Sequence, residues 1–146
     1  MKTLLFLCTG NFYRSRFAEL YFRHLCAEHS LEWIVDSRGL ALEPQNIGLS
    51  HYTQQEWRKL GISTEPHREP IPLSLDDLMK SDLTIAVKET EHCPLMRQKF
   101  PDWEHKVVYW EVHDLDVEPA NKALPLLRVH VESLFRELQN GTNNDS

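Results

Sequence analysis

Cys8 and Arg14 lie near the start of the chain, separated by five residues. A cysteine thiolate is a strong nucleophile, and an arginine guanidinium can donate two parallel hydrogen bonds to a phosphate. The segment between them contains Gly10 and Asn11, residue types that tolerate the left-handed backbone that a tight loop needs. Ser15 follows Arg14, and its hydroxyl can donate to a thiolate. These residue types at this spacing indicate a loop that holds an anion beside a nucleophilic sulfur.

This segment lies between a predicted strand and a predicted helix. Residues 3–7 form an apolar run typical of a buried parallel strand, and from Arg14 apolar residues recur at helical spacing to about residue 30. A loop that enters a helix N-terminus directs backbone N–H groups and the positive end of the helix dipole to one point, which favours an anion and a thiolate at Cys8. The residues expected to bind phosphate are Thr9, Gly10, Asn11, Phe12, Tyr13, Arg14 and Ser15.

The rest of the chain alternates predicted strands and helices. Further strands are expected at residues 32–36, 82–87 and 106–110, and helices at residues 51–60, after Ser74, at 94–100 and at 119–138. Residues 64–72 contain three prolines and are expected to be extended and irregular. On the first predicted helix, arginine and glutamate side chains are expected to fill the face opposite the apolar one.

This alternation predicts an α/β fold in three layers: a four-stranded parallel sheet with helices on both faces, and the phosphate-binding loop after the first strand. In such sheets ligands bind beyond the carboxyl ends of the strands, where Cys8 lies. Residues 1–140 are expected to form a single domain, followed by a disordered tail at residues 141–146.

Composition and charge narrow the setting. The chain has 146 residues and a formal net charge of −6, which argues against nucleic acid as a partner. No apolar run approaches the roughly 20 residues of a membrane span. The cysteines, Cys8, Cys26 and Cys93, are odd in number and widely spaced, so neither a disulfide framework nor a zinc site is indicated. We therefore expect a cytoplasmic protein with free thiols, with no metal, cofactor or membrane partner.

Several segments resemble one known family. Residues 7–15 resemble the Cys-x-Gly-Asn-x-Cys-Arg-Ser signature of the low-molecular-weight protein tyrosine phosphatases, whose fold is shared with thioredoxin-coupled arsenate reductases. Residues 36–39, 61–62 and 67–68 resemble further segments of that family. The resemblance implies an enzyme that hydrolyses phosphotyrosine or similar aryl phosphomonoesters, on a protein or a small molecule, through a phosphocysteine intermediate. Tyr13 stands where the family usually has a second, protective cysteine, so that protection is not expected.

The resemblance also implies a general acid on the loop after the fourth strand, where the family has an aspartate that is usually followed by proline. The spacing from Trp110 favours Asp114, although Leu115 replaces the proline, and Asp116 is the alternative. The aromatic pair that follows this aspartate in the family is missing. Possible substitutes for the wall of the substrate site are Leu42, Tyr52, Trp57 and Trp110.

Two alternatives use the same loop. Arsenate reduction needs two further cysteines. Cys93, before Pro94, resembles the second of them, whereas Ala86 and Val87 occupy the region of the first, so the relay looks incomplete. The other alternative is a binding module that holds a phosphorylated partner without hydrolysis, which Tyr13 and the missing proline favour. Arginine phosphate and small-molecule phosphates also remain open as substrates, and the sequence predicts no oligomeric state.

Overall fold

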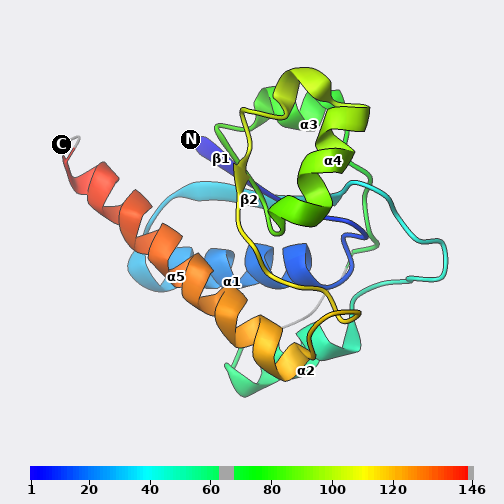
Figure 1. Ribbon diagram of the computed structural model, residues 1–146. Coiled ribbons are helices and arrows are strands. Elements are labelled where there is room, and N and C mark those ends of the chain that lie inside the picture. Colours follow the sequence, from blue (N-terminus) through cyan, green and yellow to red (C-terminus); the bar gives the residue numbers. More distant parts are fainter. Residues whose placement is uncertain (63–67, 145–146) are drawn as a thin grey trace.

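A computed structural model describes residues 1–62 and 68–144 of the chain and confirms the α/β architecture (Figure 1). The sheet has four parallel strands in the order β2-β1-β3-β4. The strands are β1 (Lys2–Cys8), β2 (Trp33–Gly39), β3 (Leu83–Ala86) and β4 (Val108–Tyr109). The loop after β1 therefore starts in the middle of the sheet, between the ends of two neighbouring strands.

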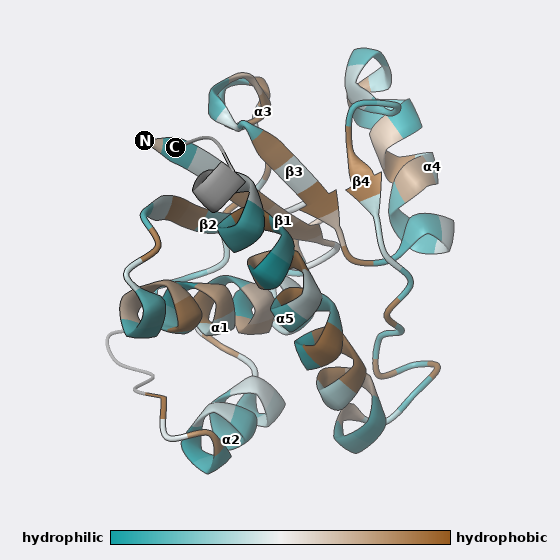
Figure 2. Ribbon diagram, turned by 90° about the vertical axis from the view of Figure 1, so that its left-hand side faces the viewer, coloured by the Kyte–Doolittle hydropathy of each residue, from teal (hydrophilic) through white to brown (hydrophobic). Residues whose placement is uncertain are grey.

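The helices cover both faces of this sheet, as Figure 2 shows. Their bounds are α1 (Arg14–His29), α2 (His51–Lys59), α3 (Leu75–Lys80), α4 (Glu89–Lys99) and α5 (Ala120–Asn144), with a short 3-10 helix at Pro101–Trp103. On one face α1 and α5 pack against each other and against the sheet, with α2 beside them, and on the other face lie α3 and α4.

Two apolar clusters hold the layers together. The larger one joins Phe6 of β1 to Phe17 and Phe22 of α1 and to Leu127 of α5, and all four side chains are fully buried. The smaller one joins the opposite face of β1 to α3 and α4 through Leu7, Leu78 and Met96. Because successive side chains of a strand point to opposite faces, the apolar run of β1 supplies both cores. The loop that follows β1 is thus attached to a strand whose last five residues are buried.

Two helix ends are fixed by residues close to them in the sequence. Ser74 accepts a hydrogen bond from the Asp77 N–H, and the Asp77 carboxylate accepts one from the Ser74 N–H, which is the capping box that starts α3. Gly61 has a φ of 74°, as expected for the residue that ends α2 in a left-handed conformation.

The polar face predicted for α1 is wrong in part. Arg16 and Glu19 are only 2% and 4% exposed, although periodicity assigns charged residues to the solvent side. Arg16 instead donates hydrogen bonds to the carbonyl oxygens of Asn11, Gly48 and Arg68. This one side chain therefore connects α1 to the loop after β1 and to the segments before α2 and α3.

The other differences concern where elements begin and end. The sequence predicts that α4 starts at Pro94, but the helix starts at Glu89 and contains Pro94. The helix can include this residue because an internal proline removes only one helical hydrogen bond. Strand β4 is shorter than predicted, and α5 continues to Asn144, beyond the predicted end of that helix at residue 138. Part of the proline-rich segment 64–72, and residues 145–146, lie outside the described residues. Among the helices that are described, none is long and apolar enough to cross a membrane.

Candidate active site

Cys8 is the last residue of β1, and its thiol is the centre of a hydrogen-bond arrangement. The Asn11 backbone N–H points at Sγ from 3.2 Å, and Ser15 Oγ lies 3.0 Å from Sγ. Since Ser15 Oγ also accepts a hydrogen bond from Asn11 Nδ2 at 2.9 Å, its own proton is available to the sulfur. Two hydrogen-bond donors therefore converge on Cys8 Sγ.

Asn11 holds the loop in its curved shape. Its φ of 50° is left-handed, as the sequence indicated for this position, whereas Gly10 does not adopt a positive φ. The Asn11 amide donates to Ser37 Oγ at 2.9 Å, and its oxygen accepts from Arg68 Nη1 at 2.9 Å. A fully buried side chain with every polar atom paired is a rigid support for the loop.

The end of β2 supports the same loop from the other side. Gly39 pairs with Cys8 in the parallel register, and a Cβ atom at position 39 would lie 2.9 Å from the Thr9 carbonyl oxygen and 3.0 Å from Asn11 Cβ. Only glycine allows so close an approach of the two backbones. The segment that resembles the family after the second strand thus packs directly beneath the loop.

Arg14 starts α1 and is 2% exposed. Its Nη1 donates to the Val112 carbonyl at 2.9 Å, and its Nη2 lies 2.6 Å from Glu91 Oε2 and 3.4 Å from Asp114 Oδ2. Burial alone would lower the pKa of Arg14, but the charges of Cys8, Glu91 and Asp114 outweigh it and raise that pKa. Arg14 is therefore a permanent cation between the sulfur and the carboxylates.

The sheet register explains how the second half of the chain reaches Arg14. Beyond β4, the Val112 N–H still donates to the Val87 carbonyl at 2.8 Å, so residues 110–112 continue alongside the end of β3. This pairing directs the Val112 carbonyl at Arg14 and carries Asp114 to the same place.

The sequence reasoning missed the contribution of α4. Glu91 accepts hydrogen bonds from Arg14 and from the Thr9 hydroxyl, and His92 Nε2 lies 2.8 Å from Glu91 and 3.0 Å from Thr9 Oγ1. His92 Nδ1 accepts from the Lys88 N–H at 3.0 Å, so the proton of a neutral ring is on Nε2 and faces these two groups. Glu91 and His92 follow β3 closely, at the carboxyl edge of a parallel sheet, and this position was the sequence signal that could have identified them as site residues.

The pKa shifts at this cluster follow from its contacts. Burial would raise the pKa of Glu91, but the hydrogen bond from His92, the charge of Arg14 and the Thr9 hydroxyl hold it well below its usual range. Burial lowers the pKa of His92, and the nearby Glu91 only partly offsets that. The pair is therefore a carboxylate beside a neutral imidazole.

A cavity of about 830 Å³ opens above the loop. Thr9, Gly10, Phe12, Tyr13 and Arg14 line it together with Cys8, while Asn11 and Ser15 lie behind the sulfur and support it from below. Both predicted acid candidates line the cavity: Asp114 contacts Arg14, whereas Asp116 is exposed. The charged residues of the lining are Arg14 and the carboxylates Glu43, Glu91, Asp114 and Asp116.

Tyr13 fills the loop position where the family that the sequence resembles usually has a second cysteine. Its ring is 5% exposed, packs edge-on against Tyr52 with centroids 6.4 Å apart, and has a hydroxyl without a hydrogen-bond partner among the described residues. Burial and the charge of Asp114 raise the pKa of Tyr13, so the phenol stays neutral. The ring is accommodated without displacing the donors to Cys8.

Of the residues suggested as a substrate wall, Tyr52 of α2 lines the cavity, next to His51. Trp57 is fully buried and Trp110 stacks on His130, so both are packing residues.

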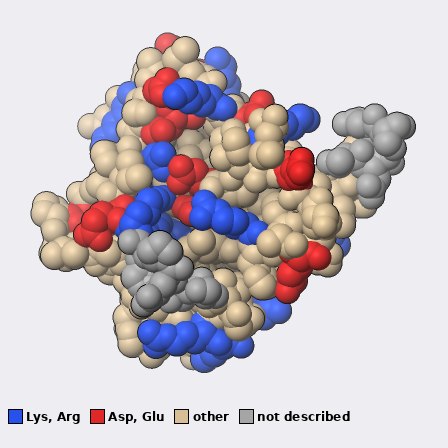
Figure 3. All heavy atoms as spheres, turned by 180° about the vertical axis from the view of Figure 1, so that it is seen from behind, with Lys and Arg blue, Asp and Glu red and all other residues tan. Residues whose placement is uncertain are grey.

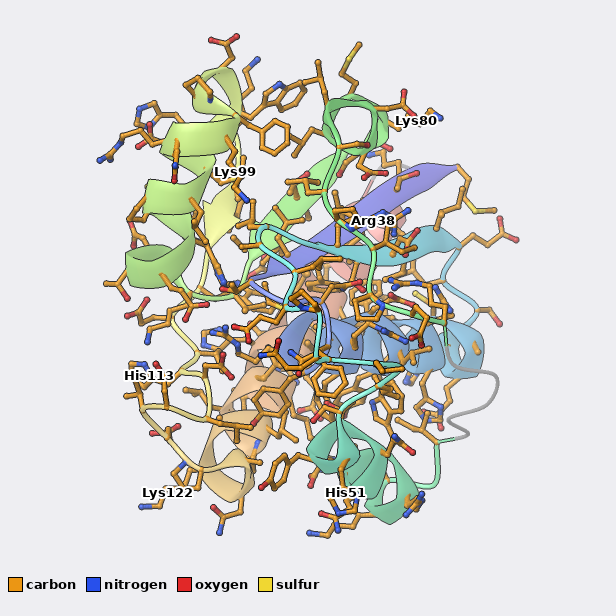
Figure 4. All side chains as sticks on the ribbon, turned by 90° about the vertical axis from the view of Figure 1, so that its right-hand side faces the viewer. Arg38, His51, Lys80, Lys99, His113 and Lys122 are labelled. Carbon is orange, nitrogen blue, oxygen red and sulfur yellow. The ribbon has the colours of Figure 1, made fainter. Side chains whose placement is uncertain are left out.

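Figure 4 shows the side of the molecule on which His51, at the start of α2, and His113, on the loop before α5, lie at different edges. Figure 3 shows acidic and basic side chains interleaved on the face opposite the view of Figure 1.

The remaining cysteines lie elsewhere. Cys26 is buried near the end of α1, and burial raises the pKa of its thiol to about 11. Cys93 on α4 donates to Glu104 at 3.4 Å. Neither thiol contacts Cys8, and all three cysteines are free. The described residues thus show no assembled cysteine relay of the kind that arsenate reduction requires.

A strand that leads through a curved loop into a helix N-terminus is typical of α/β proteins that bind phosphate beside a nucleophilic cysteine. A family model described as low molecular weight phosphotyrosine protein phosphatase matches residues 3–126. The chain belongs to this family, and it is an enzyme of the phosphatase class. No curated protein sequence matches it.

Solved structures agree with this assignment. YfkJ from Bacillus subtilis is 26% identical, with a TM-score of 0.83 over 97% of this chain and 96% of that one. The YwlE arginine phosphatase from Geobacillus stearothermophilus is 18% identical, with a TM-score of 0.81 over 100% and 98% of the two chains. A low molecular weight protein tyrosine phosphatase from T. tengcongensis is 21% identical, with a TM-score of 0.78 over 97% and 99%. At the latter two identities the likeness concerns the fold.

Proposed function

We propose that the protein hydrolyses phosphotyrosine or similar aryl phosphomonoesters in the cytoplasm through a phosphocysteine on Cys8. The observation that carries this proposal is the convergence of Ser15 Oγ and the Asn11 N–H on the sulfur, with Arg14 at the same cavity. These contacts stabilise a thiolate nucleophile and supply a cation for the phosphoryl oxygens.

In the first step the Cys8 thiolate attacks phosphorus and the bond from phosphorus to the leaving oxygen breaks. Arg14 and the loop amides bind the phosphoryl oxygens, where negative charge is concentrated. The carboxylic acid form of Asp114 donates a proton to the leaving oxygen, so the products are a neutral phenol and a phosphocysteine. The contact between Asp114 Oδ2 and Arg14 Nη2, at 3.4 Å, supports this role.

In the second step Asp114, now a carboxylate, takes a proton from water. The resulting hydroxide attacks phosphorus, the sulfur–phosphorus bond breaks, and inorganic phosphate leaves as the Cys8 thiolate is restored. The step consumes one water and needs no metal or cofactor.

The test is hydrolysis of p-nitrophenyl phosphate by the reduced protein between pH 5 and 7. We expect turnover in the wild type, none in Cys8→Ser, and no loss in Cys93→Ser, whose thiol contacts Glu104 rather than the cavity. Turnover that survives Cys8→Ser would remove the nucleophile assignment. A protein that binds phosphate without turnover would be a binding module.

Phosphoarginine is a second candidate substrate, because the cavity is lined by more carboxylates than cations. Glu43, Asp114 and Asp116 can pair with the guanidinium that carries the phosphoryl group, whereas a phenyl ring offers them no charge. Two of the structural neighbours are arginine phosphatases by name. A comparison of kcat/KM for a phosphoarginine peptide and a phosphotyrosine peptide of the same sequence decides between the candidates.

A further inference from the structure

Glu91 is a fixed anion inside the phosphate site. Its carboxylate accepts hydrogen bonds from Arg14 Nη2 at 2.6 Å and from the Thr9 hydroxyl, and His92 Nε2 lies 2.8 Å from the same oxygen. Glu91 also lines the cavity that contains Cys8. Three partners hold the carboxylate in place, so it does not need to move when the cavity is empty or occupied.

We propose that Glu91 is a specificity-determining residue, a built-in counter-ion of Arg14 that lowers the affinity of the cavity for doubly charged phosphoryl groups relative to singly charged ones. The inference rests on the proposed function in one respect, because it takes the loop to be the phosphate site. It concerns ligand charge, a role that the proposed reaction does not assign to this residue.

The physical reason is the charge balance of the cavity. Among the described residues that line it, Arg14 is the one arginine or lysine, and Glu91 and Asp114 already lie within 2.6 Å and 3.4 Å of its Nη2. A phosphate that binds Arg14 therefore comes within a few ångströms of the Glu91 carboxylate. The repulsion between them is proportional to the charge on the ligand, so a dianion loses about twice the free energy that a monoanion loses.

The groups around Glu91 keep its charge constant over the working range. Arg14 faces it from α1, His92 lies beside it on α4, Cys8 shares the cavity, and Asp114 reaches the same guanidinium from the loop before α5. Arg14 stays charged and His92 is buried and neutral, so Glu91 remains a carboxylate. The ligand itself changes charge, since the second pKa of a phosphomonoester is about 6.

The experiment measures binding of phenyl phosphate to the full chain by calorimetry, in a Cys8→Ser background that prevents turnover. Glu91→Gln removes the charge but keeps an oxygen that can accept from Arg14 and Thr9. We expect the affinity to rise about tenfold at pH 7.5, where the ligand is a dianion, and about threefold at pH 5.0, where it is a monoanion.

The matched control is Glu89→Gln. Glu89 is exposed in the first turn of the same helix and does not line the cavity, so this variant removes an equal charge without touching Arg14. We expect its affinities to match those of the parent at both pH values. If Glu91→Gln does not fold, by circular dichroism, Glu91→Ala is measured instead with the same expectation.

An affinity that falls or stays unchanged in the Glu91 variant overturns the inference, because the carboxylate would then be orienting Arg14 rather than repelling the ligand. An equal gain at both pH values also overturns it. Hydrolysis by the wild type is assayed separately. If the protein hydrolyses p-nitrophenyl phosphate but shows no charge-dependent gain in affinity, the proposed function stands and this inference fails. If it shows the charge-dependent gain but no hydrolysis, this inference stands and the proposed function fails.

Discussion

Ser15 Oγ lies 3.0 Å from Cys8 Sγ and is itself fixed by the Asn11 amide at 2.9 Å. The orientation of the Ser15 hydroxyl is fixed, because one of its lone pairs accepts from the Asn11 amide and its proton is directed at the sulfur. The arrangement is available before any substrate binds, so its contribution to a thiolate needs no reorganisation.

Ser15→Ala is expected to lower kcat for p-nitrophenyl phosphate by about 10- to 100-fold, since a hydrogen bond to a charged group is worth about 1.5–3 kcal/mol. KM should change little, because the hydroxyl lies behind the sulfur rather than in the cavity. Steady-state kinetics check this, with the exposed Ser133→Ala on α5 as the control. A change in KM alone would place Ser15 in substrate binding.

Asp114→Asn is expected to slow hydrolysis of phenyl phosphate by about 100- to 1,000-fold and that of p-nitrophenyl phosphate by less, because a good leaving group needs little protonation. The measurement is kcat over a series of aryl phosphates with different leaving-group pKa values. Asp116→Asn, at an exposed neighbouring position, serves as the control. If Asp116→Asn shows the leaving-group dependence instead, the acid is Asp116.

His92 makes folding depend on pH. Burial lowers the pKa of His92 in the folded protein, so the unfolded chain binds more protons near pH 6. The stability that neutral His92 contributes is complete above the unfolded value of about 6.5 and is lost as the pH falls. The free energy of unfolding should therefore be smaller at pH 5.5 than at pH 7.5.

His92→Asn should reduce this difference between the two pH values, as measured by urea unfolding, and it retains an acceptor for the Lys88 N–H. Burial also lowers the pKa of His130, which acts in the same direction, so part of the dependence remains in the variant. His105→Asn is the control, since that side chain is 90% exposed. An unchanged difference in His92→Asn would contradict the prediction.

Arg16→Met is expected to destabilise the protein by about 2–3 kcal/mol, because it leaves buried carbonyl groups without donors. The affected carbonyls belong to Asn11, Gly48 and Arg68. Urea unfolding measures the effect, and Arg58→Met on α2 is the control, because that residue is exposed. Equal losses in the two variants would mean that the carbonyl contacts of Arg16 contribute little.

The sequence was most informative where the structure is local. The apolar run of β1, the Gly-Asn turn and the start of α1 are consecutive, so their order alone predicted a loop between Cys8 and Arg14. The helix after Ser74 was equally readable, since both partners of its capping box lie within one turn.

Contacts between distant segments were not readable in this way. Glu91 lies 77 positions from Arg14 and meets it only because β1 and β3 are parallel neighbours, and Pro94 made the start of α4 look like a loop. Arg16 was assigned to the solvent because periodicity classifies side chains by polarity, whereas three backbone carbonyls here replace water. Tertiary context decided both cases.

The shortness of β4 has a consequence for the protein in concentrated solution. Val108 and Tyr109 pair with β3 on one side and form one edge of the sheet on the other. An edge strand is a template on which a second molecule can add its own strand and begin to aggregate, and longer, flatter edges are the more dangerous ones. A two-residue strand offers too few unpaired backbone groups for such an addition, so this edge resists aggregation.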